Sequence, residues 1–552
     1  MARDVLKSSF ENATFSIIFQ VAFRCITFIL NAYIIRTVGQ EVLGIMNVRL
    51  LLLESTILFL SKEPLLKSCL TDTRSHNWAQ VINQIWLSVP FSGLLGLLLT
   101  FIWINMLTST DEKYVTQYVV GCYAIAVSCV IEQISQVFVL VAQSFCFVRT
   151  KVTIDTFYIV SRTIIFVYLM QNNPDDAIIA FSIAQVGSAI IACLLYCIFF
   201  QWYISSIRKI RQESKIISNN EQGSIFTNME DFNFTSIKDF LPGVLKNEGS
   251  LLDTKLCLLT VSFMKQSVMK QILTEGERYV MTVSPILTFS QQSMYDIVNN
   301  LGSLAARFIF RPIEESAYFY FSQMIKRDTP LTEQNPKHIS EAAEVLSQLC
   351  KVVMSIGLLV FVFGQSYSYS FLFLYGGHKL VESNLPVTLL RFHTFAIILL
   401  AINGVTEGYV HATMDNEQLD KYNYLMVIFS VAFLLISYIF TYFIGAVGFI
   451  LANCFNMLAR IIHSTVFITK KYKGTNHNPL NHLFPGVKFL SALGISFIVT
   501  KLSEEYILQK SIILHIGIGG ICFLLAIALW VQENMLLLKL YYNKFRNIKK
   551  ES

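Results

Sequence analysis

Charged side chains stand inside apolar stretches of this sequence, where a membrane would ordinarily exclude them. Residues 47–64 are rich in leucine, with an isoleucine and a phenylalanine, yet they include Arg49 and Glu54. A charge in the middle of a membrane is costly, so it usually faces a water-filled cavity or a partner group. This pattern indicates a polar path through a membrane or a buried ion pair.

Other apolar stretches repeat the pattern at helical spacing. Gln20 and Arg24 are four residues apart, and Asp296, Asn300 and Arg307 recur over three turns, so each set shares one helix face. An arginine binds phosphate through two parallel hydrogen bonds and keeps its charge when desolvated. Amides and carboxylates suit sugar hydroxyls. The predicted cargo is a large polar group that bears phosphate, with a lipid tail. The candidate cavity residues are Arg24, Arg36, Arg49, Glu54, Arg278, Asp296, Asn300, Arg307, Arg311, Glu407 and Arg460.

A structural interpretation of the same residues stays open. Arg24, Glu54, Arg162 and Arg460 would then form buried ion pairs that fix helix packing. The 11 cysteines show no metal-ligand spacing, and no phosphate-binding glycine loop of the nucleotide-hydrolysing type occurs. We therefore predict no cofactor, no metal ion and no catalytic residue.

The composition is that of a polytopic membrane protein. Of 552 residues, 54% are hydrophobic and 14% charged, whereas soluble domains carry about 25% charged residues. A spanning helix needs about 20 mostly apolar residues, and such runs predict an all-α membrane protein with about 14 transmembrane helices. Lysine and arginine gather on one side when both termini are placed in the cytosol. The predicted runs are 13–34, 42–60, 81–105, 115–145, 152–170, 178–203, 252–273, 281–309, 341–364, 387–411, 422–443, 445–469, 486–502 and 511–535.

The polar stretch between the sixth and seventh runs divides the chain. Residues 1–203 are predicted to form a first lobe of six helices, 204–250 a flexible cytosolic linker, and 251–470 a second lobe of six. Residues 471–552 add two helices and a cytosolic tail. A faint repeat aligns Phe59 with Phe308 and Lys62 with Arg311. Two facing lobes around a hydrated central cavity are the simplest arrangement of the polar stripes.

Four stretches resemble the Rft family of the endoplasmic reticulum: "RTVGQEVLGIMNVRLLLLESTILFLSKEP", "MKQILTEGERYVMT", "YDIVNNLGSLAARFIFRPIEES" and "NGVTEGYVHATM". The resemblance implies translocation of a dolichol-diphosphate heptasaccharide, five mannoses on two N-acetylglucosamines, to the luminal leaflet for N-glycosylation. It also implies the fold of the multidrug, oligosaccharidyl-lipid and polysaccharide exporter superfamily. Other membrane proteins of the same pathway are possible partners, and nucleic acid is not. Lys549 and Lys550 resemble a cytosolic dilysine signal for retrieval to the endoplasmic reticulum.

Three other functions are weighed against this one. A cation-coupled multidrug-type exporter would use a membrane carboxylate such as Glu132, Asp155 or Asp296. A dolichol-dependent glycosyltransferase would need a sizeable acidic luminal loop, and the predicted loops are short. An accessory protein of the dolichol-linked oligosaccharide pathway, without flippase activity, fits the same sequence.

Overall fold

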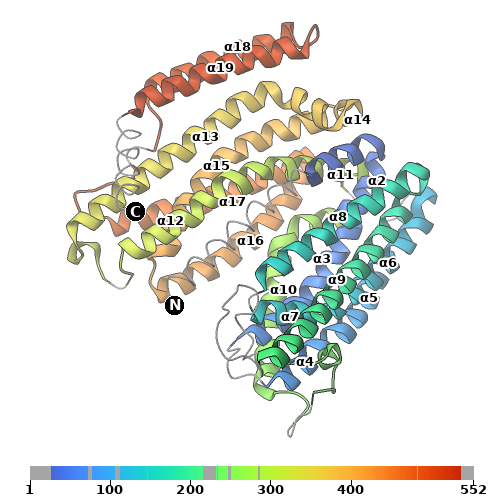
Figure 1. Cartoon of the computed structure of the whole chain (residues 1–552). Coiled ribbons are helices and arrows are strands. Elements are labelled where there is room, and N and C mark those ends of the chain that lie inside the picture. Colours follow the sequence, from blue (N-terminus) through green and yellow to red (C-terminus); the bar gives the residue numbers. More distant parts are fainter. Residues whose placement is uncertain are drawn as a thin grey trace. The chain divides into compact units, whose positions relative to one another are not determined.

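The chain folds into helices throughout the part that the structure describes (Figure 1). The computed structural model describes residues 26–71, 77–105, 112–145, 147–214, 232, 234–245, 250–283, 286–327, 329–480 and 483–535. Long apolar runs form helices because a helix pairs its own backbone N–H and C=O groups, which hydrocarbon cannot do. The predicted all-α fold is confirmed.

Ten of the described helices are long and apolar enough to cross a membrane, and they match ten of the predicted runs. The first predicted run is described only from Ile26, in the helix Ile26–Thr37. The runs predicted at 252–273 and 486–502 lie in helices outside this set, and the run predicted at 281–309 is divided between the end of one helix at Val283 and a second helix that begins at Phe289. The ten spans are Gln40–Leu70, Trp78–Asn105, Val115–Ser144, Arg149–Asn172, Ala177–Lys209, Pro336–Gly376, Leu385–Thr413, Glu417–Ile444, Val447–Lys471 and Ile512–Glu533.

The first of two compact units covers Met1–Ser293. In it α3 packs against α5 and α10, α6 packs against α5 and α9, and α8 packs against α9 (Figure 1). Its helices are α2 (Gln40–Gly44), the π-helix η1 (Ile45–Leu50), α3 (Leu51–Leu70), α4 (Trp78–Trp86), α5 (Ser88–Asn105), α6 (Val115–Ile134), α7 (Gln136–Ser144), α8 (Val148–Asn172), α9 (Ala177–Ser214) and α10 (Thr254–Val283).

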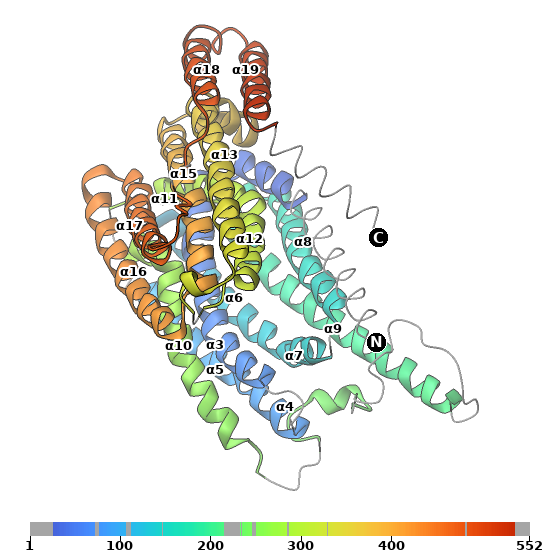
Figure 2. The ribbon, with the colours of Figure 1, turned by 90° about the vertical axis from the view of Figure 1, so that its left-hand side faces the viewer.

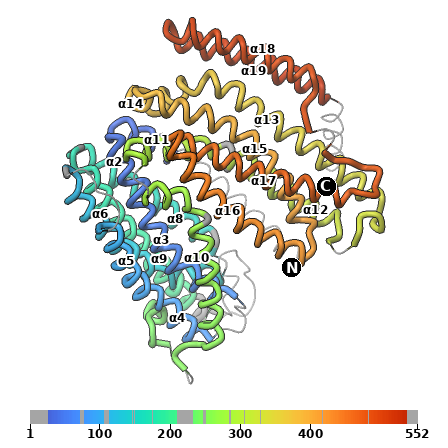
Figure 3. The backbone as a smooth tube through the Cα atoms, turned by 180° about the vertical axis from the view of Figure 1, so that it is seen from behind, coloured from blue at the N-terminus to red at the C-terminus, as the bar shows by residue number. Residues whose placement is uncertain are grey.

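The second unit covers Met294–Ser552. In it α15 lies between α13 and α17, and α16 packs on the other side of α17 (Figure 3). The α18–α19 hairpin packs on α13 (Figure 2). The helices are α11 (Phe289–Ala305), which begins in the first unit, the π-helix η6 (Ala306–Phe310), α12 (Arg311–Met324), α13 (Pro336–Gly376), α14 (His378–Val381), α15 (Leu385–Thr413), α16 (Asn416–Ile444), α17 (Val447–Lys471), α18 (Val487–Tyr506) and α19 (Ile512–Glu533).

The division between the units differs from the predicted lobe boundary. The sequence places the second lobe from residue 251, whereas the compact units divide after Ser293. The reason is that α10 packs along α3. Hydroxyl groups join the two helices, because Thr260 Oγ1 donates to Ser68 Oγ at 2.7 Å and Tyr279 OH lies 2.7 Å from Thr56 Oγ1.

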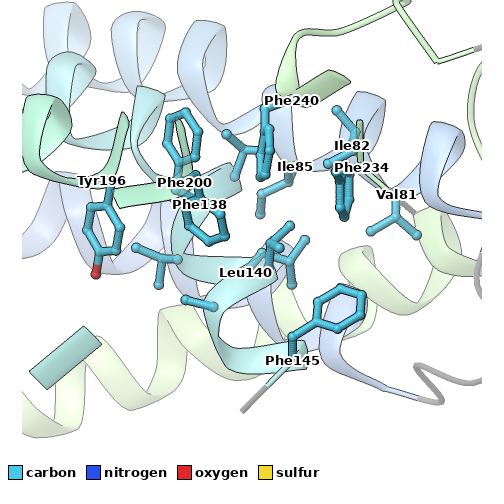
Figure 4. Packing of buried hydrophobic residues seen from close by; sticks show 14 of the residues in the cluster. Val81, Ile82, Ile85, Phe138, Leu140, Phe145, Tyr196, Phe200, Phe234 and Phe240 are labelled. Atoms are coloured by element: carbon cyan, nitrogen blue, oxygen red, sulfur yellow. The ribbon is translucent and has the colours of Figure 1, made fainter. Parts of the chain in front are cut away.

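The described part of the segment 204–250 is not a flexible linker. Phe232, Phe234 and Phe240 are each at most 2% exposed and pack into the aromatic core of the first unit. Figure 4 shows Phe234 and Phe240 among the residues of this core. Trp86 Nε1 donates to the Phe240 carbonyl at 2.7 Å, which ties the segment to α4. Low average hydrophobicity misled the prediction, because three phenylalanines suffice to anchor a short polar segment.

Candidate functional site

A buried carboxylate joins three helices of the first unit. Glu54 of α3 accepts a hydrogen bond from Gln185 Nε2 of α9 at 2.5 Å. Its second carboxylate oxygen lies 3.8 Å from Arg162 NH1 of α8. Arg162 NH1 also donates to Gln185 Oε1 at 3.2 Å, and Tyr158 OH completes the group 3.4 Å from Glu54. We call Glu54, Tyr158, Arg162 and Gln185 the first charge cluster.

Neighbouring turns of α3, α8 and α9, together with α6, add weaker polar contacts. Lys62 Nζ lies 3.5 Å from Glu132 Oε1, and Asp155 accepts from Tyr196 OH at 3.3 Å. Glu132 and Asp155 are the carboxylates of this unit that a cation-coupled exporter would use. Each already has a basic or hydroxyl partner.

A second buried carboxylate joins α15, α16 and α17 in the other unit. Glu407 accepts from Tyr422 OH at 2.7 Å and from Asn403 Nδ2 at 3.1 Å. Arg460 NH2 of α17 forms an ion pair with the same carboxylate. His411 Nε2 lies 3.6 Å from Glu407 Oε1, one helical turn along α15. We call Asn403, Glu407, His411, Tyr422 and Arg460 the second charge cluster.

The second charge cluster has spare hydrogen-bonding capacity. Asn403 is 5% exposed, and within the described chain its Oδ1 has no hydrogen-bond partner. The same holds for Arg460 Nε and for Nδ1 of His463, whose ring stacks on Tyr422 with centroids 4.9 Å apart. Buried polar atoms of this kind usually bind water or a ligand.

Both clusters fit the structural interpretation of their charges. Glu54 with Arg162 and Glu407 with Arg460 each pair a buried carboxylate with a partly buried arginine, and each pair links different helices. Removing one partner of such a pair is costly because the other charge stays buried. In the parts of the chain that the structure describes, no group of histidine, cysteine and carboxylate side chains is arranged to hold a metal ion.

Two predicted arginines lie on π-helical turns. Arg49 belongs to η1 and Arg307 to η6. Arg49 is 2% exposed, and its guanidinium lies 5.3 Å from the centroid of the Phe289 ring. The side chain of Arg307 lies outside the described atoms. Single π-helical turns are rare and are frequently found at functional sites.

The other predicted residues lie apart from the two clusters. Arg311 pairs with Glu315 at 2.9 Å, and the two side chains are 72% and 68% exposed. Arg278 lies 3.2 Å from Glu275, and Arg36 is exposed on its helix. Asp296 accepts from Asn300 Nδ2 at 3.1 Å. Arg24, Lys549 and Lys550 fall outside the described residues.

The sequence prediction missed Tyr158, Gln185 and Tyr422. Gln185 carried a usable signal, because it is an amide inside the apolar span Ala177–Lys209. The two tyrosines carried none, since tyrosine is common in membrane helices and only the tertiary contacts reveal which hydroxyls meet a carboxylate.

A family profile and several known proteins match this chain over nearly its whole length. The sequence profile described as Rft protein matches residues 8–544. Two relatives are named "Man(5)GlcNAc(2)-PP-dolichol translocation protein RFT1". The one from Drosophila melanogaster is 47% identical, covering 100% of both chains. The one from Xenopus tropicalis is 39% identical, covering 95% of each.

A solved structure with a similar fold is "Lipid II flippase MurJ, inward closed conformation". It superposes with a TM-score of 0.50 at 12% identity, covering 90% of this chain and 98% of that chain. At this low sequence identity, the superposition shows that the two proteins share a fold.

Proposed function

Because this chain belongs to the Rft family, we propose that it moves Man5GlcNAc2-diphosphate-dolichol from the cytosolic to the luminal leaflet of the endoplasmic reticulum membrane. The observation that carries the proposal is its 47% identity, over the full length of both chains, to a protein named for translocation of that lipid. The protein acts as a transporter and not as an enzyme, since the lipid changes leaflet without a change of bonds.

Several of the predicted arginines are the proposed contacts for the diphosphate. Arg311 suits this role because its ion pair with Glu315 is exposed. An exposed pair contributes little stability, so a diphosphate replaces the carboxylate at small cost. The location of Arg49 and Arg307 on π-helical turns supports the same role for them. The full proposed set for the diphosphate is Arg24, Arg36, Arg49, Arg278, Arg307 and Arg311.

The two charge clusters have a supporting role in this proposal. Glu54 and Glu407 each hold three helices together through paired charges, which keeps each unit rigid during transport. The second charge cluster also offers sugars the unpartnered Asn403 Oδ1 and Arg460 Nε. Amide and guanidinium groups of this kind bind hydroxyls.

The proposal includes an orientation in the membrane. Both termini lie in the cytosol, since lysine and arginine then gather on the cytosolic side. Lys549 and Lys550 would there act in retrieval to the endoplasmic reticulum. Protease accessibility of a tag at each terminus, in sealed microsomes, tests this orientation.

Transbilayer movement of the lipid tests the function directly. The purified protein is reconstituted alone in liposomes with Man5GlcNAc2-diphosphate-dolichol in the outer leaflet, and movement inward is followed by loss of access to an external lectin. We expect movement well above that in empty liposomes, and its loss in the Arg24→Gln/Arg307→Gln double variant. Folded protein that moves no lipid would contradict transport and favour an accessory role in the pathway. Dependence on a proton gradient would favour a cation-coupled exporter.

A further inference from the structure

A hollow of about 500 Å³ lies in the second unit where the α18–α19 turn meets α13. The volume is within the usual range for small-molecule sites. It belongs to neither charge cluster. The residues that line it are Tyr369, Phe373, Glu504, Leu508, Gln509 and Ile512.

Two aromatic residues of α13 line part of the hollow. Tyr369 and Phe373 stand one turn apart on α13, and their rings are parallel within 5°, with centroids 6.3 Å apart. Each ring has an apolar face. The C–H face of a hexose ring packs well on such a surface, because the aromatic face carries partial negative charge.

Two polar residues, Glu504 and Gln509, also line the hollow. Glu504 forms ion pairs with Arg391 and with Lys501, whose Nζ lies 2.7 Å from Glu504 Oε2. These contacts hold the carboxylate in place, and its remaining lone pairs can accept further hydrogen bonds. Gln509, exposed in the turn, adds an amide that both donates and accepts.

Polar contacts fix the hairpin that forms the hollow. His515 of α19 is fully buried and stacks on Tyr367 of α13 with centroids 4.2 Å apart. Its Nδ1 lies 2.8 Å from Ser503 Oγ of α18, and Tyr367 OH donates to the His515 carbonyl at 2.7 Å. One histidine therefore joins all three helices, so the hollow is preformed and needs little rearrangement to bind a ligand.

We propose that this hollow binds a hexose unit of a glycan, with the ring on Tyr369 and Phe373 and the hydroxyls toward Glu504 and Gln509. The proposal rests on the proposed function for its source of glycan, because the α18–α19 turn lies on the predicted luminal side. The hollow is then a second contact for the sugar part of the lipid, separate from the arginines assigned to the diphosphate.

A sugar fits the hollow better than an anion or an acyl chain. The carboxylate of Glu504 lines the hollow, and its two basic partners, Arg391 and Lys501, are not among the lining residues and are already paired with it. An acyl chain would leave Glu504 and Gln509 without hydrogen-bonding ligands, which is unfavourable once water is displaced. A hexose has apolar faces and a polar edge, as the hollow has.

Saturation-transfer NMR with an α-linked mannose disaccharide tests the hollow. The protein is held in phosphatidylcholine nanodiscs, because glycoside detergents would compete for the same surface. We expect saturation of the sugar ring protons with wild type, and about tenfold weaker binding for Tyr369→Ala, the loss expected from one aromatic contact. Gln509→Ala should weaken binding without affecting folding, since its side chain is exposed.

Two controls separate binding from folding. Tyr369→Phe keeps the flat ring and should bind as wild type does. Tyr506→Ala removes a 63% exposed ring of α18 that does not line the hollow, and should also leave binding unchanged. Absence of saturation with wild type, equal binding by Tyr369→Ala and Gln509→Ala, or displacement of the sugar by inorganic phosphate would each overturn the proposal.

The same samples distinguish this proposal from the proposed function. Sugar binding that depends on Tyr369 and Gln509, in a protein that moves no lipid in liposomes, supports the hollow and contradicts translocation. If the wild-type protein moves lipid but binds no disaccharide, translocation is supported and sugar binding in the hollow is contradicted.

Discussion

The carboxylate of Glu54 accepts a 2.5 Å hydrogen bond from Gln185, although 131 residues separate them in the chain. The two lie on α3 and α9, and Arg162 of α8 contacts both. This group shows how the first unit keeps a charge inside apolar helices.

Removing Glu54 should destabilise the protein strongly. Glu54→Ala leaves Arg162 partly buried without its carboxylate, which costs about 3 kcal/mol in the free energy of unfolding. Adding Arg162→Met should recover part of this loss, because no charge then remains unpaired. Thermal unfolding in nanodiscs measures both. Glu315→Ala, which breaks an exposed ion pair, is the control and should change stability by less than about 0.5 kcal/mol.

Tyr422→Phe tests the second charge cluster. The hydroxyl of Tyr422 donates to Glu407 at 2.7 Å. Hydrogen bonds to charged groups contribute about 1.5–3 kcal/mol, so the variant should unfold at a lower temperature. Tyr424→Phe is the matched control, because Tyr424 is on the same helix and 71% exposed. Equal melting of the two variants would show that the bond to Glu407 contributes nothing.

Gly44→Ala should disrupt the packing of the α2–η1 junction. A Cβ at Gly44 would lie 2.2 Å from the backbone oxygen of Phe289, and a backbone cannot rotate away as a side chain can. We expect destabilisation of about 1–3 kcal/mol and low yield of folded protein. A Cβ at Gly39 would have no neighbour within 4 Å, so Gly39→Ala should behave as wild type. The two variants are compared by size-exclusion chromatography and by thermal unfolding.

Phe240→Ala should release the segment that packs on the first unit. Phe240 is 1% exposed and stacks in a cluster with Phe138, Phe200 and Phe234. Truncating a buried phenylalanine costs about 3–5 kcal/mol. Limited proteolysis should cut the variant faster between α9 and α10. Leu241→Ala, at a neighbouring residue that is 47% exposed, should be cut at the wild-type rate.

Arg311→Gln should lower translocation without lowering stability. The ion pair with Glu315 is exposed, so its loss hardly affects folding, whereas loss of a phosphate contact reduces the transport rate by about tenfold or more. Arg311→Lys should restore transport only in part, because lysine cannot bind phosphate through two parallel bonds. Lys421→Gln breaks a similarly exposed pair with Glu417 and should transport normally. Unchanged transport by Arg311→Gln would remove Arg311 from the proposed site.

The helices follow directly from the sequence. The predicted runs 387–411 and 445–469 compare with Leu385–Thr413 and Val447–Lys471 in the structure. Apolar runs of this length leave few alternatives, since each helix satisfies its own backbone. The sequence also marks Glu54, Glu407 and Arg460 as unusual, because a charge in an apolar run has a cost that some contact must offset.

Only the tertiary structure decides which of these charges meet. Helical periodicity places Glu54 on one face of α3 and Arg162 on one face of α8, but the rotation and depth at which two helices pack depend on every side chain along them. The same reason explains why the sequence predicts a flexible linker over residues 204–250. Phe232, Phe234 and Phe240 gain their stability from residues of α4, α7 and α9, and no local pattern contains those contacts.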